Sequence, residues 1–412
     1  MKTAPPAFEL LTFDLTAQQE MRPMTSFELR THGSMRELGQ TTYEGLLPPG
    51  RPPFLSFAWL DALERTGCVG EERGWLPQHI SLHENGECVA AAPAYVKTNS
   101  EGEFVFDYSW ARHSEGVLRA PYYPKLVLAV PFTPATGPRI LIRPDQDRGR
   151  ILAAFARAIP QLCSALPVSG AHVLFLPEAD SAALTEQGFA ERRGVQFHWE
   201  NPGYASFDDF LSRMNSKKRN QLKRERREMH DRNVEITALS GRELTPELID
   251  FVFDFYLSTV EKFAWGRQYL KRELFEEIAK TMPNELHVVA ARQAGKLVGG
   301  AFNFLGQDAL YGRYWGATHE VPFLHFNVCF YFGIEECIRR GLKKFEPGAG
   351  GEHKVARGFE PTVTFSSHFL RHKQLDGAVR DFLARECEAV DEHVAAARAD
   401  GVLKPFDHTK AL

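Results

Sequence analysis

The chain has 412 residues, 43% of them hydrophobic and 25% charged, and its formal net charge at pH 7 is −4. This length exceeds what one hydrophobic core usually holds, so we expect two domains. A near-neutral charge excludes a global field for nucleic acid or membranes, and any such binding must come from a local patch. Six scattered cysteines without a C-x-x-C pair indicate neither a zinc framework nor a redox motif.

The sequence also lacks targeting and nucleotide-binding signatures. MKTAPPAFELLTFDL at the N-terminus has no basic segment followed by an apolar run, and no stretch reaches the roughly 20 apolar residues of a membrane span. We therefore expect a cytoplasmic protein without a metal site or a membrane span. The motifs G-x-x-x-x-G-K-[ST], G-x-G-x-x-G, H-E-x-x-H and G-x-S-x-G are absent, which argues against nucleotide hydrolysis, dinucleotide redox, zinc hydrolysis and serine esterase chemistry.

The first half of the chain predicts alternating strands and helices. After a tail at residues 1–25, FELRTHGSM (27–35) predicts a strand, and Ser56 can cap a helix that ends at Gly67. Asn85 and Gly86 predict the turn of a β-hairpin. EFVFDYSWA (103–111) predicts another strand. A helix, a short buried strand at 172–177, a second helix and a strand or strand pair at 189–201 follow.

The stretch SFDDFLSRMNSKKRNQLKRERREMH (206–230) predicts one long helix or two joined ones, with Ser206 and Asp209 in a capping arrangement. Between Arg213 and Arg232 there are nine basic and three acidic residues. Such a face can bind phosphate of a nucleotide or a tRNA backbone, although many basic runs are only solvated helix faces. No aromatic residue interleaves, which argues against base stacking. The phosphate- or tRNA-binding candidates are Lys217, Lys218, Arg219, Lys223 and Arg224.

The second half predicts a strand at 234–240, helices at 245–263 and 270–282, a hairpin and a third strand at 309–317. A long apolar helix (323–341), a short strand (343–348), a strand (362–370) and a closing helix (376–400) follow. This order is that of the GNAT N-acyltransferase fold, and the first half can be read as a second copy. We therefore expect an α/β fold of two tandem GNAT-like domains with mixed central sheets. The expected boundaries are a tail at 1–25, an N-terminal domain at 26–205, a basic helical connector at 206–232 and a C-terminal domain at 233–412 that carries the active site.

The loop EPGAGGEHKVARGFEP (346–361) gathers charged side chains between two strands. Acyl transfer to an amine needs a base for the amine proton and a donor for the developing oxyanion. Glu346 and His353 are the candidate catalytic bases. Lys354 and Arg357 are candidates for holding a carboxylate, a phosphate or the oxyanion, and the glycines let backbone approach a ligand closely. The alternative is a crowded polar turn.

Other side chains predict the walls of a substrate cleft. In ALYGRYWGA (309–317), strand alternation places Tyr311, Arg313 and Trp315 on one face, although an aromatic core strand fits equally well. YYPK (122–125) offers two hydroxyls and one ammonium beside an apolar strand, or else a surface loop that covers the core. The remaining substrate-binding candidates are Arg313, Tyr314 and His325 in the C-terminal domain and Tyr122, Tyr123 and Lys125 in the N-terminal domain.

Several motifs together resemble the FemAB-like family of N-acyltransferases. They are YYPKL, VPFTPATGPR, SKKRNQLKRERR, GRYWG, HFNVCFYFGIEECIRRGLKKFEPGAGGEHKVARGF and EPT. The resemblance covers most of the chain and implies two GNAT-like domains and transfer of an acyl group to an amine of a small molecule or peptide. The Fem enzymes transfer amino acids from aminoacyl-tRNA to cell-wall precursors, so the resemblance also implies a link to peptidoglycan.

One departure from the GNAT pattern concerns the donor. GNAT enzymes hold the CoA pyrophosphate with a [QR]-x-x-G-x-[GA] loop at the start of the central helix, whereas this chain has THEVPFLHFN (318–327). Either acyl-CoA binds differently, or the donor is an aminoacyl-tRNA. Two alternatives therefore stand beside a general N-acyltransferase: aminoacyl-tRNA-dependent transfer to a cell-wall precursor, and a non-catalytic module that binds peptidoglycan or a peptide.

Overall fold

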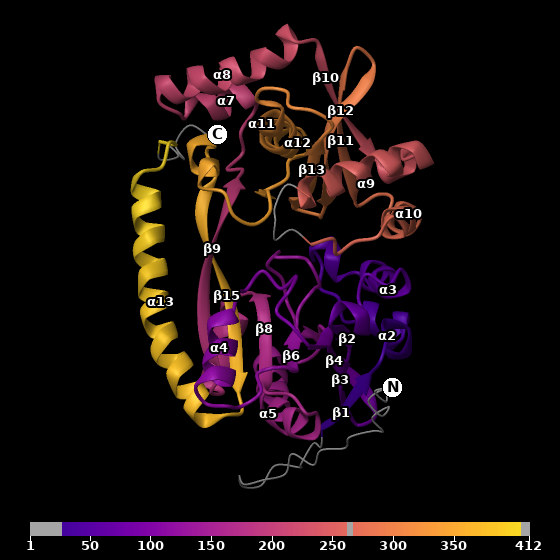
Figure 1. Cartoon of the computed structure of the whole chain (residues 1–412), viewed down its shortest axis with the longest axis vertical. Coiled ribbons are helices and arrows are strands. Elements are labelled where there is room, and N and C mark those ends of the chain that lie inside the picture. The colour runs from indigo at the N-terminus through magenta and orange to yellow at the C-terminus, as the bar shows by residue number, and fades with distance from the viewer. Residues whose placement is uncertain (1–26, 262–266, 405–412) are drawn as a thin grey trace. The chain divides into compact units, whose positions relative to one another are not determined.

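The computed structural model describes residues 27–261 and 267–404, and its chain divides into two compact units (Figure 1). The first contains the chain up to Gly194 together with Thr364–Ala389, and the second contains Val195–Val363 and the residues from Val390 onward. The basic segment that we expected as a connector therefore falls inside the second unit. The tail at 1–25 lies outside the described residues.

The first unit combines two sheets with helices. In space the strands follow the orders β1-β3-β4-β7 and β15-β8-β6-β5-β2. β6 and β8 are parallel, and β15 runs antiparallel to β8. Helix α5 packs its buried face into the core of this unit. The elements up to residue 200 are β1 (Phe27–His32), α1 (Met35–Leu38), α2 (Gln40–Glu44), α3 (Phe57–Arg65), β2 (Trp75–Pro77), β3 (His79–Glu84), β4 (Glu87–Ala92), β5 (Ala94–Lys97), α4 (Tyr108–Gly116), β6 (Lys125–Leu128), β7 (Leu141–Ile142), α5 (Arg148–Ala165), β8 (Gly170–Leu176), α6 (Glu178–Glu186) and β9 (Ala190–Glu200), with short 3₁₀ turns at Pro53–Leu55 and Glu71–Arg73. The residues of β9 from Val195 onward belong to the second unit.

Local signals in the first unit were predicted well at caps and turns. The Ser56 hydroxyl accepts a hydrogen bond from the Trp59 amide at 3.2 Å, which starts α3. Asn85 and Gly86 both have positive φ, 53° and 82°, as the tight β3–β4 hairpin requires. The strand expected at 103–111 was wrong, because Asp107 turns into a buried polar network and α4 begins directly after it.

The second unit has one mixed sheet in the order β10-β11-β12-β13-β14-β9. Its order of elements is the one predicted from the sequence, and residues 262–263 of the first predicted helix lie outside the described residues. The elements from residue 207 onward are α7 (Phe207–Ser212), α8 (Ser216–Asp231), β10 (Val234–Ser240), α9 (Pro246–Val260), α10 (Arg272–Thr281), β11 (Leu286–Gln293), β12 (Lys296–Leu305), β13 (Ala309–Ala317), α11 (Leu324–Phe326), a π-helical segment (Asn327–Tyr331), α12 (Phe332–Arg340), β14 (Lys344–Glu346), β15 (Glu360–Leu370) and α13 (Lys373–Ala399), with 3₁₀ turns at Gly241–Glu243 and Glu352–Arg357. Most of β15 and of α13 belongs to the first unit.

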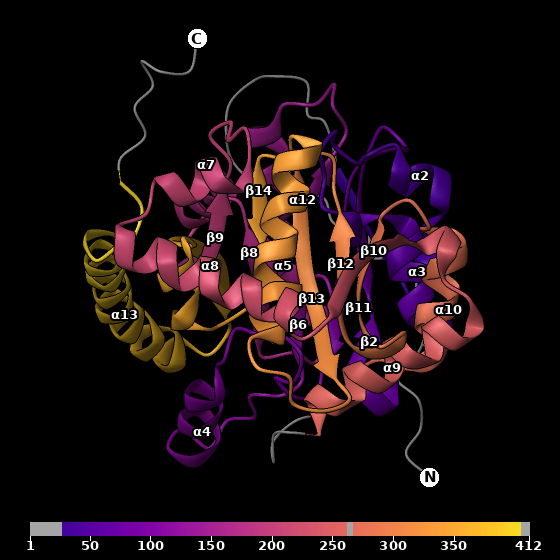
Figure 2. The same cartoon turned by 90° about the horizontal axis from the view of Figure 1, so that it is seen from above.

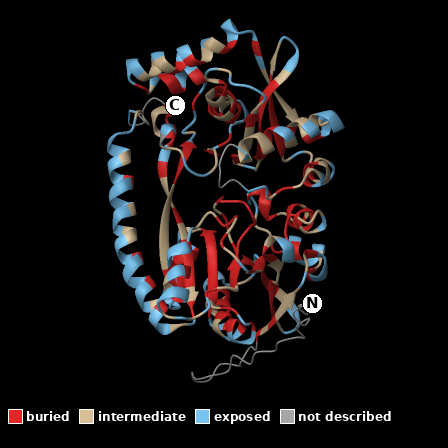
Figure 3. Ribbon diagram, viewed as in Figure 1, coloured by how far each residue is buried: buried red, intermediate tan, exposed pale blue. Residues whose placement is uncertain are grey.

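Helices cover both faces of this sheet. Successive residues of a strand point to opposite faces, and the neighbouring glycines of β12 reveal what each face meets. A Cβ on Gly300 would lie 3.2 Å from Phe255 of α9, whereas a Cβ on Gly299 would lie 3.0 Å from Leu324 of α11. Figure 2 shows α12 lying along β13 and β14. The second unit is therefore a three-layer α/β/α structure with buried central strands (Figure 3).

The basic stretch forms two helices. Ser206 caps α7 through the Asp209 amide at 3.1 Å, as the sequence predicted. The Asn215 side chain accepts from the Lys218 amide at 2.9 Å and so begins α8. Among the residues that the structure describes, no helix combines the length and apolarity needed to cross a membrane.

Gly316 tests this packing. A Cβ at this position would lie 2.1 Å from the carbonyl oxygen of Phe255, which is backbone and cannot rotate away. We expect Gly316→Ala to lower the free energy of unfolding by roughly 1–3 kcal/mol through overpacking, measured by urea denaturation. Gly377→Ala is the control, because nothing lies near its added Cβ in α13, and it should leave stability unchanged or raise it. Equal midpoints for Gly316→Ala and wild type would contradict this packing.

Candidate active site

The central sheet of the second unit opens where β13 and β14 part. The two parallel strands pair only at Ala309–Lys344, Leu310–Phe345 and Tyr311–Glu346. Directly beyond, β13 carries a bulge, since Phe302 of β12 pairs with Tyr314 and Asn303 pairs with Gly312. Arg313 is thus the extra residue, which breaks the alternation that we had expected along this strand. Glu346 stands at the last pair, at the end of β14.

Glu346 belongs to a buried charged centre. Its side chain is 4% exposed and forms an ion pair with Lys344. His198 Nε2 of β9 lies 4.0 Å from Glu346 Oε2 and 3.2 Å from Gln196 Oε1. Burial is the main cause that lowers the pKa of His198 to about 4, with Lys344 and Lys354 adding to it against the attraction of Glu346. His198 is therefore neutral at physiological pH and can accept a proton.

The sequence analysis missed His198. It lies in β9 within Gln196, His198 and Glu200, where polar side chains alternate with Phe197 and Trp199. That alternation places the polar set on the opposite face of the strand from Phe197 and Trp199, which belong to the hydrophobic core. A buried histidine on a strand was the available signal, but only the β9–β14 pairing shows that it meets Glu346.

Lys354 is held above the end of β14 by a glycine-rich loop. Gly348, Gly350 and Gly351 have φ of 91°, 72° and 92°, conformations that suit glycine. The chain then turns back, and Lys354 Nζ donates to the Gly348 carbonyl oxygen at 2.6 Å. The Lys354 side chain is buried, and this burial lowers its pKa to about 8. The structure thus places a readily deprotonated ammonium close enough to His198 to influence its pKa.

His353 points elsewhere, into an aromatic group. Its ring lies 5.7 Å from that of Phe330, 5.9 Å from His325 and 6.0 Å from Phe326. Partial burial, Arg357 and Lys354 lower the pKa of His353. The contacts among described residues do not join His353 to Glu346, so the two base candidates from the sequence belong to different groups.

Arg357 is occupied by an internal ion pair. Its Nη2 lies 3.1 Å from Glu225 Oε2 of α8, and its Nε donates to the Tyr331 hydroxyl at 3.1 Å. Tyr331 in turn donates to Glu225, and the guanidinium carbon lies 3.3 Å from the ring centroid of Phe326. All three polar side chains are buried or nearly so. Arg357 therefore joins α8, the π-helical segment and the loop after β14, and its guanidinium is not directed at a free ligand position.

A pocket of about 540 Å³ opens at the start of the helix that follows β13. It occupies the place where GNAT enzymes carry the pyrophosphate loop. Trp315 and His325 contact each other in its wall, with ring centroids 4.4 Å apart and planes tilted by 40°, and Pro322 removes one backbone donor. The lining residues are Trp315, Ala317, Thr318, His319, Glu320, Val321, Pro322, Phe323, Leu324, His325 and Phe326. No lysine or arginine is among them.

The other candidates from the C-terminal half are spread over this unit. Tyr314 packs its ring edge-on against Tyr256 at 5.1 Å, and the Arg313 guanidinium lies 5.6 Å from the Tyr314 ring centroid. On α8, Lys217, Lys223 and Arg224 are exposed, and Lys218 and Arg219 are partly exposed. Of these five, Lys223 has an acidic partner, Asp208, at 3.1 Å.

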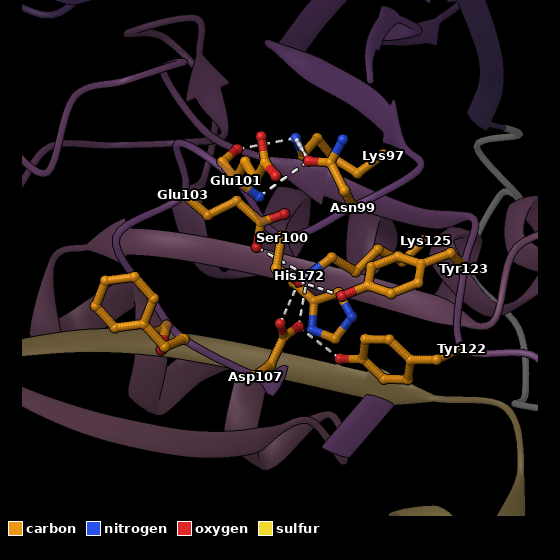
Figure 4. A network of polar contacts seen from close by, with 12 residues as sticks. Lys97, Asn99, Ser100, Glu101, Glu103, Asp107, Tyr122, Tyr123, Lys125 and His172 are labelled. Carbon is orange, nitrogen blue, oxygen red and sulfur yellow. Dashed lines mark hydrogen bonds and ion pairs between the residues drawn. The ribbon is translucent and has the colours of Figure 1, made fainter. Parts of the chain in front are cut away.

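Tyr122, Tyr123 and Lys125 come together in the first unit. Lys125 Nζ is fully buried and donates to Ser100 Oγ (2.9 Å), Glu103 Oε2 (2.8 Å) and Asp107 Oδ2 (2.5 Å). The Tyr122 hydroxyl donates to Asp107 at 2.6 Å, and that of Tyr123 lies 2.8 Å from Ser100 Oγ (Figure 4). Burial raises the pKa of Glu103 to about 7, even though Lys125 opposes this. Tyr122, Tyr123 and Lys125, which we predicted to bind substrate, therefore take part in an internal polar network.

Comparison with known proteins decides the family. The model of the FemAB-like family, described as peptidoglycan biosynthesis/recognition, matches residues 34–406. The chain belongs to this family. As a FemAB-like protein it is a transferase of acyl or aminoacyl groups. No curated protein matches the sequence.

Several solved structures are similar to this FemAB-like chain. FemX shares 10% sequence identity at a TM-score of 0.50, covering 86% of this chain and 100% of FemX. L-PGS from Bacillus licheniformis (9% identity, TM-score 0.48) covers 78% of this chain and 95% of its own. A tandem GNAT protein from the clavulanic acid biosynthesis pathway (11% identity, TM-score 0.43) covers 83% and 98%. The likeness to FemX confirms the tandem GNAT-like fold. In the part of the chain that the structure describes, no group of His, Cys, Asp and Glu could hold a metal ion.

The internal ion pair gives a prediction for stability. Arg357→Met would leave Glu225 buried without its cation, and breaking a buried pair costs about 3–5 kcal/mol. We expect a correspondingly lower urea midpoint. Arg227→Met is the matched control, because Arg227 lies on the exposed face of α8, the helix that carries Glu225. This variant should unfold like wild type. An unchanged midpoint for Arg357→Met would show that the pair does not hold these segments together.

Proposed function

We propose that the FemAB-like protein transfers an aminoacyl group from aminoacyl-tRNA to an amine of a cell-wall precursor, at the centre formed by Glu346, His198 and Lys354. The observation that carries the proposal is the buried His198 that lies 4.0 Å from Glu346 where β13 and β14 part. The family description supports the cell-wall acceptor. Transfer of an aminoacyl group to an amine needs one proton acceptor, one stabiliser of negative charge and an opening for two substrates.

His198 is the proton acceptor in this scheme. The acceptor amine attacks the carbonyl carbon of the donor ester, and its nitrogen loses a proton to His198 Nδ1, because Nε2 already donates its hydrogen to Gln196 Oε1. The imidazolium that forms is stabilised by the Glu346 carboxylate 4.0 Å away. Lys354 Nζ donates to the oxyanion of the tetrahedral intermediate. The tRNA hydroxyl then leaves and takes up a proton, and the new amide remains on the acceptor.

The choice of donor follows from where the cations lie. The pocket of residues 315–326 is lined by one glutamate, two histidines and no lysine or arginine, so a CoA pyrophosphate would meet little fixed positive charge there. On α8, in contrast, Lys217, Lys218 and Arg224 have no acidic partner among the described residues. Rows of unpaired cations bind nucleic-acid backbones. This contrast favours aminoacyl-tRNA over acyl-CoA, which remains the second candidate donor.

Substitution of the proton acceptor tests the site. We expect His198→Asn and Glu346→Gln to lower turnover by about 10²–10⁴-fold, the usual contribution of general acid–base catalysis, while the melting temperature stays near wild type. Transfer of a radiolabelled amino acid from a charged tRNA pool to a cell-wall peptide precursor is the assay. His353→Asn is the control at the other base candidate. Loss of turnover in His353→Asn alone would move the catalytic base to that residue.

The pH profile tests Lys354. Its pKa of about 8 means that the ammonium is lost as the pH rises through that value, so turnover should fall above about pH 8. In Lys354→Met the rate should be lower and this alkaline limb should be absent. An alkaline limb of the same midpoint in the variant would show that another group titrates.

Charge reversal on α8 tests the donor. We expect Lys217→Glu, Lys218→Glu and Arg224→Glu together to abolish tRNA retention on a filter and to flatten the dependence of binding on salt. Lys296→Glu is the control, because it reverses an exposed cation at the start of β12. Retention of tRNA by the triple variant, or thermal stabilisation of the wild type by an acyl-CoA and not by tRNA, would favour the second donor.

A further inference from the structure

The first unit exposes a small group of large apolar side chains. In the described ranges, four such side chains are exposed: Phe106 (61%), Tyr108 (45%), Val117 (67%) and Phe382 (36%). Phe106 and Tyr108 lie at the start of α4, whereas Val117 follows its last residue and lies about half a turn around the helix from Tyr108. The rings of Phe106 and Tyr108 stack on each other with centroids 6.1 Å apart and planes 19° apart. Single exposed apolar residues are ordinary, but a group of them marks an interaction surface.

The buried network holds this pair in place. Asp107, between the two aromatic residues, is only 3% exposed. Its carboxylate accepts hydrogen bonds from Ser100, Tyr122 and Lys125, which converge on it in Figure 4. Lys125 and the hydrogen bonds outweigh the effect of burial and keep the pKa of Asp107 below its usual range. Because Asp107 is fixed inward as an anion, its two neighbours are fixed at the surface.

A second set of contacts fixes the backbone beside Phe106. Arg192 Nη1 of β9 donates to the Phe106 carbonyl oxygen at 2.9 Å. The same guanidinium binds both carboxylate oxygens of Glu386 at 2.7 Å and lies 5.1 Å from the ring centroid of Trp110 in α4. The exposed pair is therefore preorganised, and a partner that binds it needs to order little of the backbone.

Positive charge surrounds the group. Arg112 and Arg119 are exposed on and just after α4, and Arg371 and Lys373 are exposed at the start of α13. Ser114, Ala120, Arg371 and His372 line one pocket of about 410 Å³, so the end of α4 adjoins the start of α13. These four cations have no acidic partner among the described residues. In residues 106–119 and 371–380, Asp107 and Asp376 are paired, which leaves Glu115 as the one exposed unpaired acid.

We propose that residues 106–119, with Arg371 and Lys373, form a docking surface for an anionic lipid bilayer. Phe106 and Tyr108 enter the headgroup region, where aromatic side chains are favoured. The surrounding cations bind lipid phosphates. A second copy of the chain fits less well, because a two-fold contact through this surface would bring the cations of both copies together. The surface does not depend on the transfer reaction proposed above.

Vesicle sedimentation tests the docking surface. The full-length protein should pellet with vesicles of equimolar phosphatidylglycerol and phosphatidylcholine, and much less with phosphatidylcholine alone. Phe106→Ser with Tyr108→Ser should reduce the bound fraction at least roughly tenfold, since each replacement removes an apolar side chain from the contact. Arg112→Glu with Arg119→Glu should do the same for the anionic vesicles. Phe382→Ser, an exposed apolar residue on α13 outside the group, is the matched control and should bind like wild type.

Several outcomes would overturn the proposal. Failure of the wild type to pellet with the anionic vesicles is one, and wild-type pelleting of the Phe106/Tyr108 variant is another. Self-association that this variant abolishes, without vesicle binding by the wild type, would assign the surface to a second copy. The Arg112/Arg119 variant supplies an independent reduction in binding if the Phe106/Tyr108 variant does not fold.

Discussion

The pairing of Arg357 with buried Glu225 is the interaction on which the architecture around the candidate active site depends. It links a basic helix, a π-helical segment and the glycine-rich loop after β14 through three polar side chains. Isolated burial of either charge would cost several kcal/mol, so Arg357 and Glu225 require each other. The loop that carries Lys354 and His353 therefore cannot take its observed course unless α8 is docked.

The contacts around Glu225 also explain the π-helical segment. A π-turn widens a helix by one residue and is frequent near functional sites. Here it carries Asn327 and Tyr331: Asn327 donates to the Glu225 carbonyl oxygen at 2.9 Å, and Tyr331 donates to the Glu225 carboxylate. A basic outer face and an acidic inner residue thus share one helix. The outer face can meet a polyanion, while the inner residue fixes the loop that carries Lys354 of the proposed catalytic centre.

Sequence reasoning reached the fold more fully than the site. Caps such as Ser56 and Ser206, the Asn85-Gly86 turn and the order of elements in the second unit are local signals, and the structure confirms them. EFVFDYSWA was misread, because the burial of Asp107 depends on Lys125, which lies 18 residues further along the chain. His198 was missed for the same reason: its meaning comes from Glu346, 148 positions later, and strand pairing alone brings the two together. Local sequence patterns determine the helices and strands. Pairing between residues far apart in the sequence determines which polar side chains lie in the same site.

The division of the chain has a consequence for its synthesis. The first unit includes residues 364–389, so strand β15 cannot pair with β8 until nearly the whole polypeptide has left the ribosome. Domains usually fold in order as they emerge. Here the first unit cannot complete its sheet until β15 has been synthesised, which happens after most of the second unit. Truncation near residue 360 would therefore remove part of the N-terminal unit along with the C-terminal end. The nascent chain depends on protection of the exposed edge of β8 throughout that interval.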